Sequence, residues 1–226
     1  GPRVLTMLFI QLIFLAQDNI ASRLETGSVT ALVYGWLFMQ VPETLIGTAI
    51  ATVLLPMISE QFAQKQADIF RTTLNHAFRD LLALTIPSAL LLGTVIRPVV
   101  GILDFDNAGT DMVVWATRMF LIGMAGHALL ETASRSFYAQ QDARTPLITA
   151  GLNTVLFVVL ANLLASGLNL DAPGIALANS LAYTSQAVVL LILLNRKHPG
   201  ILNPGGTLWR VGIGSLASFL LCYALL

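Results

Sequence analysis

The chain has 226 residues, 56% of them hydrophobic and 11% charged, and its mean hydropathy is +0.77. This composition excludes an ordinary soluble enzyme and indicates that lipid surrounds much of the folded chain. Twelve lysines and arginines balance twelve aspartates and glutamates, so no basic excess points to a nucleic-acid partner. The single cysteine, Cys222, has no partner for a disulfide or a thiolate metal site.

Seven apolar segments are long enough to cross a membrane as helices. A span needs roughly 20 residues, because only helices and closed barrels satisfy their backbone groups within hydrocarbon. None of the segments alternates like a barrel strand, so the fold class we expect is an all-α integral membrane protein. The expected spans lie near residues 4–24, 29–59, 74–103, 111–139, 146–168, 174–195 and 208–226.

Polar and turn-forming segments separate these spans, and the longest of them is the run 60–75. Pro42 lies inside the second span, where it removes a backbone hydrogen bond and predicts a kink near mid-membrane. The chain starts with Gly1-Pro2-Arg3 and enters an apolar segment at once. We therefore expect it to be a piece of a longer protein.

The basic residues predict the orientation of the spans. They flank the second, fourth and sixth connections and the start of the chain, as Lys65, Arg71, Arg79, Arg135, Arg144, Arg196, Lys197, Arg210 and Arg3. The other connections carry mainly acidic residues. By the positive-inside rule, the N-terminus of this chain is expected in the cytoplasm.

Ionisable side chains inside spans are candidates for function, because each costs about 2.5–3.5 kcal/mol on insertion scales. The candidates are Asp18, Glu43, Arg118, His127 and Glu131. Asp18 lies near the end of its helix, where it can also reach the interface. Glu43 follows Pro42, so it can line a cavity at the kink or, protonated, bond to a neighbouring helix.

His127, Glu131 and Arg135 follow each other at a spacing of four residues and share one helix face. Such a ladder indicates either a substrate or ion pathway, or a set of salt bridges that only neutralises its own charges. A transporter predicts that the ladder faces water, and a scaffold predicts that it is paired and buried. His127 and Glu131 alone do not make a metal site, because two ligands on one helix are not a closed set.

Two motifs resemble the MurJ (MviN) family of lipid II flippases. The run LIGTAIATVLLPMIS at residues 45–59, with Gly27-Ser28-Val29 and Pro42 before it, is similar to the family's seventh and eighth helices. The run RSFYAQQDARTP resembles the signature around the family's loop between helices ten and eleven, and it contains Arg135, Tyr138, Asp142, Arg144 and Pro146. The segment from Gly174 to Ser180 and Asn153 also match in order.

The resemblance implies that residues 1–200 form the second, six-helix lobe of a MOP-superfamily exporter, and that 201–226 are a linker and the start of an additional helix. Such a protein moves lipid-linked peptidoglycan precursor (lipid II) across the bacterial cytoplasmic membrane by alternating access, without being an enzyme or needing a cofactor. Its partners would be that precursor, membrane lipids and the missing N-terminal lobe. The alternatives are a MOP-type carrier of another polyprenyl-linked glycan or solute, or a non-transporting scaffold.

Within this reading, the substrate cavity is expected to contain Glu43, His127, Glu131 and Arg135. The family's cavity arginine in a Tyr-Ala-x-Arg context is replaced by Leu37. The family's sodium site corresponds here to Gln17 with Asp18 one step out of register, Asn153, Phe157, Ile175 and Asn179. Because Phe157 replaces a carboxylate, and hard cations require oxygen ligands, a coupling cation is not expected to bind as in the family. A degenerate ion site would use Asp18, Asn153 and Asn179.

Overall fold

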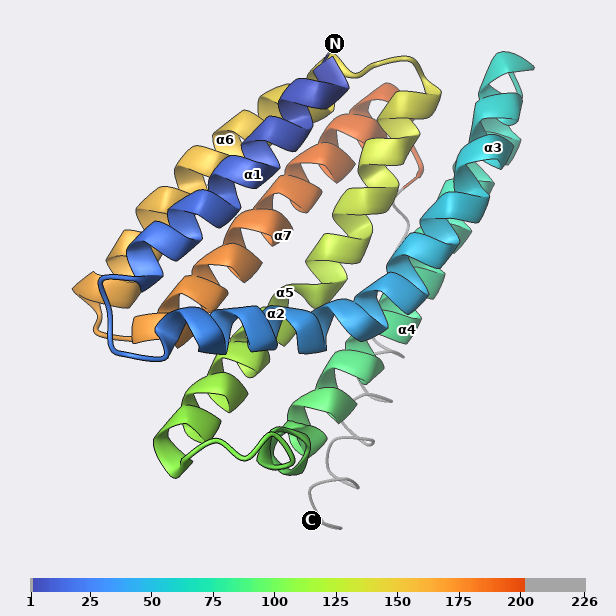
Figure 1. Cartoon of the computed structure of the whole chain (residues 1–226). Helices are drawn as coiled ribbons and strands as arrows, with labels where there is room; N and C mark the ends of the chain where they lie inside the picture. The colour runs from blue at the N-terminus through green and yellow to red at the C-terminus, as the bar shows by residue number, and fades with distance from the viewer. Residues whose placement is uncertain (1, 202–226) are drawn as a thin grey trace.

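The computed structural model describes residues 2–201 and folds them entirely into helices and their connections (Figure 1). The helices are α1 (Pro2–Ala21), α2 (Ser28–Glu43), α3 (Ala49–Ala63), α4 (Ala67–Gly101), α5 (Asn107–Ala139), α6 (Arg144–Asn162) and α7 (Asp171–Lys197). Two π-helical turns, η1 (Thr44–Thr48) and η2 (Leu163–Gly167), join α2 to α3 and extend α6. Six of the resulting segments are long and apolar enough to span a membrane, and each overlaps one of the first six predicted spans. The seventh, near 208–226, lies outside the described residues.

The second span changes direction where the sequence predicts a kink. Pro42 stands one residue before the end of α2, and the π-helical turn η1 follows immediately. Since proline has no backbone N–H, the regular hydrogen-bond ladder is interrupted there, and a π-turn is one way to re-form it. Figure 1 shows α2 crossing the bundle before α3 turns toward its upper edge. The bend therefore places η1 and Glu43 in the middle of the span.

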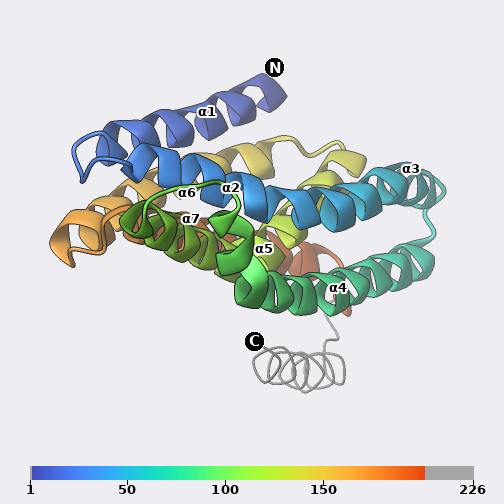
Figure 2. The same ribbon diagram turned by 60° about the horizontal axis from the view of Figure 1, so that its bottom comes forward.

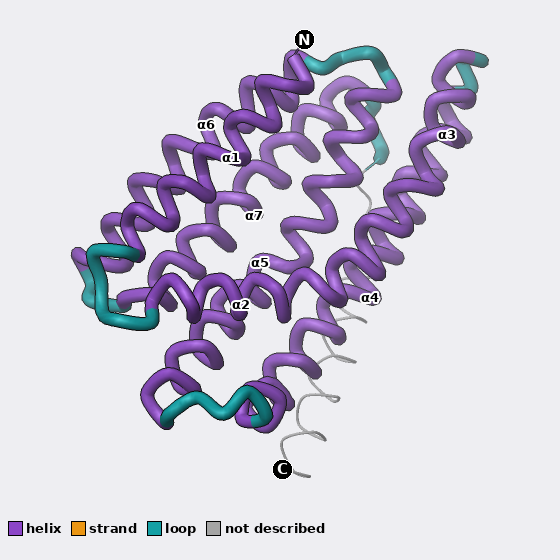
Figure 3. The backbone as a smooth tube through the Cα atoms, in the orientation of Figure 1, coloured by secondary structure: helices purple, strands orange, loops and turns teal. Residues whose placement is uncertain are grey.

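The connections alternate between the two ends of the bundle (Figure 3). Residues 22–27, 102–106 and 168–170 lie at one end, and residues 64–66 and 140–143 lie at the other. The predicted break at 60–75 is wrong in length, because only 64–66 are non-helical. Polar residues such as Asp68 are exposed on α4, and a helix that emerges from hydrocarbon keeps its internal backbone bonds in water as well.

Helices α5 and α7 form the centre of the bundle, and they share its most extensive helix contact. Helices α1 and α6 lie side by side at one edge, and α3 and α4 at the other, as Figures 1 and 2 show together. Helix α2 crosses α5 and also contacts α7. The polar side chains of α5 are therefore surrounded by several neighbouring helices.

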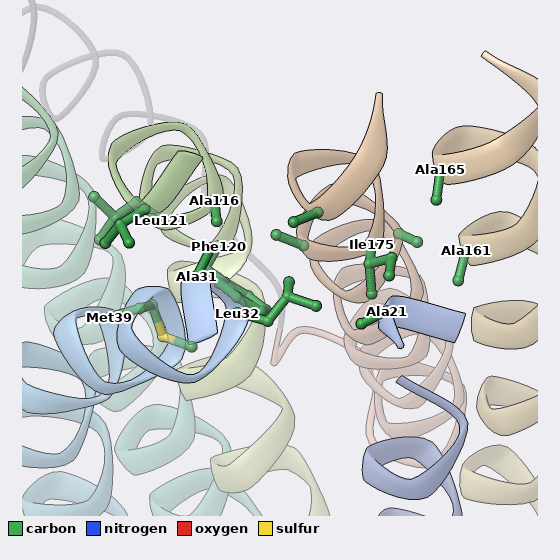
Figure 4. Packing of buried hydrophobic residues seen from close by; sticks show 14 of the residues in the cluster. Ala21, Ala31, Leu32, Met39, Ala116, Phe120, Leu121, Ala161, Ala165 and Ile175 are labelled. Atoms are coloured by element: carbon green, nitrogen blue, oxygen red, sulfur yellow. The ribbon is translucent and has the colours of Figure 1, made fainter. Parts of the chain in front are cut away.

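Small residues allow this close packing. Gly174, Ala176 and Ala178 are buried on α7. A Cβ on Gly174 would lie 2.9 Å from backbone atoms of η2. Figure 4 shows Ala161 and Ala165 facing Ile175. Lipid tails are as apolar as leucine, so helices in a membrane associate through such contacts rather than by excluding water.

Candidate functional site

A cleft of about 360 Å³ opens between α1, α2, α5, α6 and α7. All four residues predicted for the substrate cavity, Glu43, His127, Glu131 and Arg135, line it. Aromatic and apolar side chains form much of the remaining wall, including Phe9, Ile13, Trp36, Met39 and Tyr183. The structure therefore gathers the predicted cavity residues around one polar opening in an apolar bundle.

Glu131 and Arg135 form the polar centre of the cleft. Their side chains are ion-paired within α5 and are 27% and 22% exposed. Thr48 donates a hydrogen bond from Oγ1 to Glu131 Oε2 at 3.0 Å, and Arg135 Nη1 donates to Thr52 Oγ1 at 3.1 Å. This network fixes the two charges and joins α5 to the segment that follows the proline kink.

Glu43 lies beside this network without a cation of its own. Its side chain is half-buried, and it lines the same cleft as Glu131. No salt bridge involves Glu43 within residues 2–201. Glu43, Glu131 and Arg135 together give the cleft two carboxylates and one guanidinium, which is a formal excess of one negative charge. A ligand that brings a positive or hydrogen-donating group would therefore fit beside Glu43.

His127 is held between aromatic rings at the inner end of the ladder. Its Nε2 lies 3.1 Å from Asn179 Oδ1, its ring stacks on Tyr183 at 4.2 Å, and Trp36 meets it edge-on at 5.3 Å. With the proton on Nε2, the imidazole donates to the Asn179 amide. His127 therefore helps to hold Trp36, Asn179 and Tyr183 in place in the wall of the cleft. Within the described part of the chain, no group of three or more His, Cys, Asp or Glu could hold a metal ion.

The residues that correspond to the family's sodium site do not supply its oxygen set. Gln17 and Asn153 are buried, and each has a side-chain oxygen without a hydrogen-bond partner. Asp18, in contrast, is exposed, so the structure does not bring its carboxylate into the core. Phe157 is fully buried among apolar side chains, and Asn179 directs its oxygen to His127. Two neutral oxygens without a carboxylate are a poor match to a hard cation.

Several residues in or next to the cleft were not predicted from the sequence. Thr48 and Thr52 bond to the ion pair, and Trp36 and Tyr183 enclose His127. The four-residue spacing of the two threonines, the first of them six residues after Pro42, was the signal available for them. Leu37 is 49% exposed and does not line the cleft.

Arg118 is not part of the cleft. It lines a different opening between α4 and α5, and its Nε donates to the Gly93 carbonyl at 3.1 Å. Positions 118 and 127 are nine residues apart on one helix, which rotates them by about 180° around the axis. Arg118 thus lies on the opposite face of α5 from His127 and the cleft.

The signature loop lies at the end of the bundle that carries the 140–143 connection. Tyr138 and Pro146 line the cleft, and Arg144 is exposed at the first turn of α6. Asp142 accepts hydrogen bonds from Thr145 N at 3.1 Å and Thr145 Oγ1 at 2.8 Å, and it pairs with Lys197 at the end of α7. The loop therefore ties α5, α6 and α7 together.

The Asp142 interactions predict an acid-dependent loss of stability. Burial alone would raise the pKa of Asp142, but the hydrogen bonds from Lys197 and Thr145 outweigh it and lower the pKa from 3.8 to about 2. A lowered pKa means that the stabilisation is present above pH 3.8 and is lost as the pH falls through about 2. The melting-temperature difference between the parent protein and Asp142→Asn should stay constant from neutral pH to about 4 and shrink below it. A difference that is independent of pH down to 2 would contradict this assignment.

Comparisons with known proteins agree with this architecture. The family model described as lipid II flippase MurJ matches residues 1–226. The chain is 31% identical to the lipid II flippase MurJ of Burkholderia cenocepacia over 214 residues, which covers 90% of this chain and 39% of that protein. It is 32% identical to the probable lipid II flippase MurJ of Rhizobium meliloti over 197 residues, covering 85% of this chain and 36% of that protein. The chain thus spans less than half the length of these curated relatives.

Solved structures show the same fold. A lipid II flippase MurJ in an inward closed conformation superposes with a TM-score of 0.85 at 24% identity, covering 97% of this chain and 46% of that one. An outward-facing MATE multidrug transporter of the MOP superfamily gives a TM-score of 0.77 at 16% identity, covering 98% of this chain and 51% of that one. Because the family model matches the whole chain, this multi-pass membrane protein belongs to the MurJ family of lipid II flippases.

Proposed function

We propose that the full-length protein containing this chain flips lipid II across the bacterial cytoplasmic membrane by alternating access, and that this chain supplies one of its two lobes. Membership of the family supports lipid II as the substrate. The chain covers only 39% of the Burkholderia cenocepacia relative, which supports a second lobe elsewhere in the full-length protein. The protein acts as a translocator rather than an enzyme, with lipid II and membrane lipids as its partners. No cofactor takes part.

The observation that carries the proposal is the polar cleft. A structural salt-bridge ladder would bury and pair all its charges, whereas Glu131 and Arg135 are partly exposed in an opening of about 360 Å³ and Glu43 has no cation. In an apolar bundle, partly exposed charges around an opening indicate a hydrated path. The cleft therefore favours transport over a scaffold.

The cleft also indicates which part of the substrate this lobe contacts. Arg135 is already paired with Glu131, and Leu37 replaces the arginine that the sequence comparison with the family leads us to expect. The cation that would neutralise the pyrophosphate of lipid II must then come from the rest of the protein. This lobe supplies carboxylates and hydroxyls, which suit the hydrogen-bond donors of the sugars and peptide.

The orientation follows from the same charges. Arg71, Arg144 and Lys197 lie near the end of the bundle that carries the 64–66 and 140–143 connections. Asp104, Asp106 and Asp171 lie near the other end. By the positive-inside rule, the first of these ends and the N-terminus of this chain face the cytoplasm.

Complementation tests the function. The full-length parent gene is placed in a bacterium depleted of its own lipid II flippase, and we expect the wild type to restore growth. Glu43→Gln should abolish the rescue at normal membrane expression, because it removes the free carboxylate of the cleft. Glu25→Gln is the matched control, since Glu25 is exposed in the α1–α2 connection, and it should rescue fully.

The two failures of this experiment have different meanings. A well-expressed parent protein that does not rescue would exclude lipid II as the substrate and favour another lipid-linked glycan, with Leu37 as the first residue to restore to arginine. Rescue by Glu43→Gln equal to that of the wild type would remove Glu43 from the transport path while leaving the function intact.

A further inference from the structure

A second opening, separate from the cleft, lies between the outer faces of α4 and α5. Its volume is about 820 Å³. The walls are mostly apolar, with Ala89, Leu90, Met119, Leu121 and Ile122 among the residues that form them. Figure 2 shows α4 and α5 side by side, near the end that carries their 102–106 connection. A groove with such walls suits a hydrocarbon chain.

One charge in this groove has no counter-charge. Arg118 is partly buried, donates from Nε to the Gly93 carbonyl at 3.1 Å, and lies over the Trp115 ring at 5.2 Å. Within residues 2–201, no carboxylate pairs with Arg118. Its two Nη groups remain available, and a guanidinium presents them in the fork that binds a phosphate through two hydrogen bonds. An arginine within a span is costly unless its donors have partners, and the Gly93 carbonyl takes only one of its five.

Acidic residues lie beside the mouth of the groove, next to the lining residue Arg97. Arg97 Nη1 forms a salt bridge with Asp111 Oδ1 at 2.8 Å. On α5, Asp111 lies two helical turns, or about 10 Å, nearer the end of the bundle than Arg118. Asp104 and Asp106 are exposed in the connection beyond it. Inward from the surface, the acidic residues beside the groove therefore come first, and the free guanidinium of Arg118 follows with an apolar wall beside it. A lipid with a net negative charge would be repelled at this mouth.

We propose that the α4–α5 groove binds one molecule of phosphatidylethanolamine. The phosphodiester accepts hydrogen bonds from the Nη groups of Arg118, an acyl chain lies along Ala89, Gly93 and Ile122, and the ammonium group points to the carboxylates at the mouth. The charge sequence of the groove matches that of this zwitterionic headgroup. The site is separate from the cleft and does not depend on the transported substrate.

Native mass spectrometry of the full-length parent protein tests this site. The delipidated protein is titrated with phosphatidylethanolamine and, separately, with phosphatidylglycerol of the same acyl chains. We expect one tightly retained phosphatidylethanolamine, and about tenfold weaker binding of it in Arg118→Gln, as expected for loss of a charge-assisted contact. Gly93→Leu should weaken binding similarly by filling the groove, because a Cβ there meets only Leu121 Cδ1 at 3.7 Å.

Arg196→Gln is the matched control, because Arg196 is exposed at the far end of α7 and its loss changes the net charge equally. It should leave lipid retention unchanged. Equal retention by Arg118→Gln and the parent would overturn the site, and so would tighter binding of phosphatidylglycerol. If Gly93→Leu retains phosphatidylethanolamine but melts at a lower temperature, a helix from the rest of the protein fills the groove and the proposal is wrong.

Discussion

Replacing Arg135 with glutamine should destabilise the full-length protein, and removing the Glu43 charge from the same variant should restore much of the loss. Glu43, Glu131 and Arg135 line the cleft, and Arg135 is the one cation of these three. Without it, the cleft holds two carboxylates and no cation among these residues, in partly shielded surroundings. The pair is neither fully exposed nor fully buried, so we expect Arg135→Gln to lower the free energy of unfolding by about 2 kcal/mol.

The measurement is thermal unfolding of the purified full-length protein carrying Arg135→Gln, Glu43→Gln or both. The double variant should be more stable than Arg135→Gln by about 1 kcal/mol, since coupled residues show non-additive effects. Glu25→Gln combined with Arg135→Gln serves as the control, because Glu25 is exposed outside the cleft. A double variant no more stable than this control would refute the electrostatic account of the cleft.

The same network has a consequence for movement. Thr48 and Thr52 follow the proline kink, whereas Glu131 and Arg135 belong to α5. Any rotation of the α3 segment away from α5 must therefore break two hydrogen bonds to charged groups, each worth roughly 1.5–3 kcal/mol. A ligand that replaces these bonds lowers the cost of the rotation, and this is how substrate binding can shift the population of conformers.

Hydropathy alone predicted the six spans of the described chain, because a span must be both long and apolar. It was less informative at the membrane surface. The run 60–75 is polar, yet all but residues 64–66 are helical, because a helix outside the hydrocarbon region can carry polar side chains without penalty. The periodicity of α5 likewise predicted that His127, Glu131 and Arg135 share a face, since that property belongs to a single helix.

The partners of these residues could not be predicted in the same way. Which side chain meets His127 depends on the crossing of α5 over α7, and this placed Asn179 and Tyr183 against the ring. A one-residue step on α1 decides that Gln17 is buried and Asp18 exposed, because neighbouring positions on a helix differ by about 100°. Charge content marked Arg118 as a candidate, but only the packing of α4 showed that it serves a second opening.

Substituting Gly123 with alanine should destabilise the protein strongly, because among the described glycines of α5 a Cβ here would come nearest to the backbone of α7. A Cβ at Gly123 would lie 2.6 Å from the Cα of Ser180, a backbone atom that cannot rotate away. The Ser180 hydroxyl is also engaged there, donating to the Met119 carbonyl at 2.6 Å. Overpacking of this kind costs about 3 kcal/mol when the helices cannot separate, so we expect Gly123→Ala to melt at a clearly lower temperature.

Gly101→Ala is the matched control, because Gly101 is also helical and a Cβ there meets no atom within 4 Å. Alanine is the better helix former by about 1 kcal/mol, so this control should leave stability unchanged or slightly raised. The measurement is the melting temperature of the full-length protein carrying each variant, and we expect Gly123→Ala to melt below Gly101→Ala. Equal stability of the two variants would mean that α5 and α7 can move apart without loss. The walls of the cleft would then not be held by this contact, and the positions of His127 and Asn179 would need another cause.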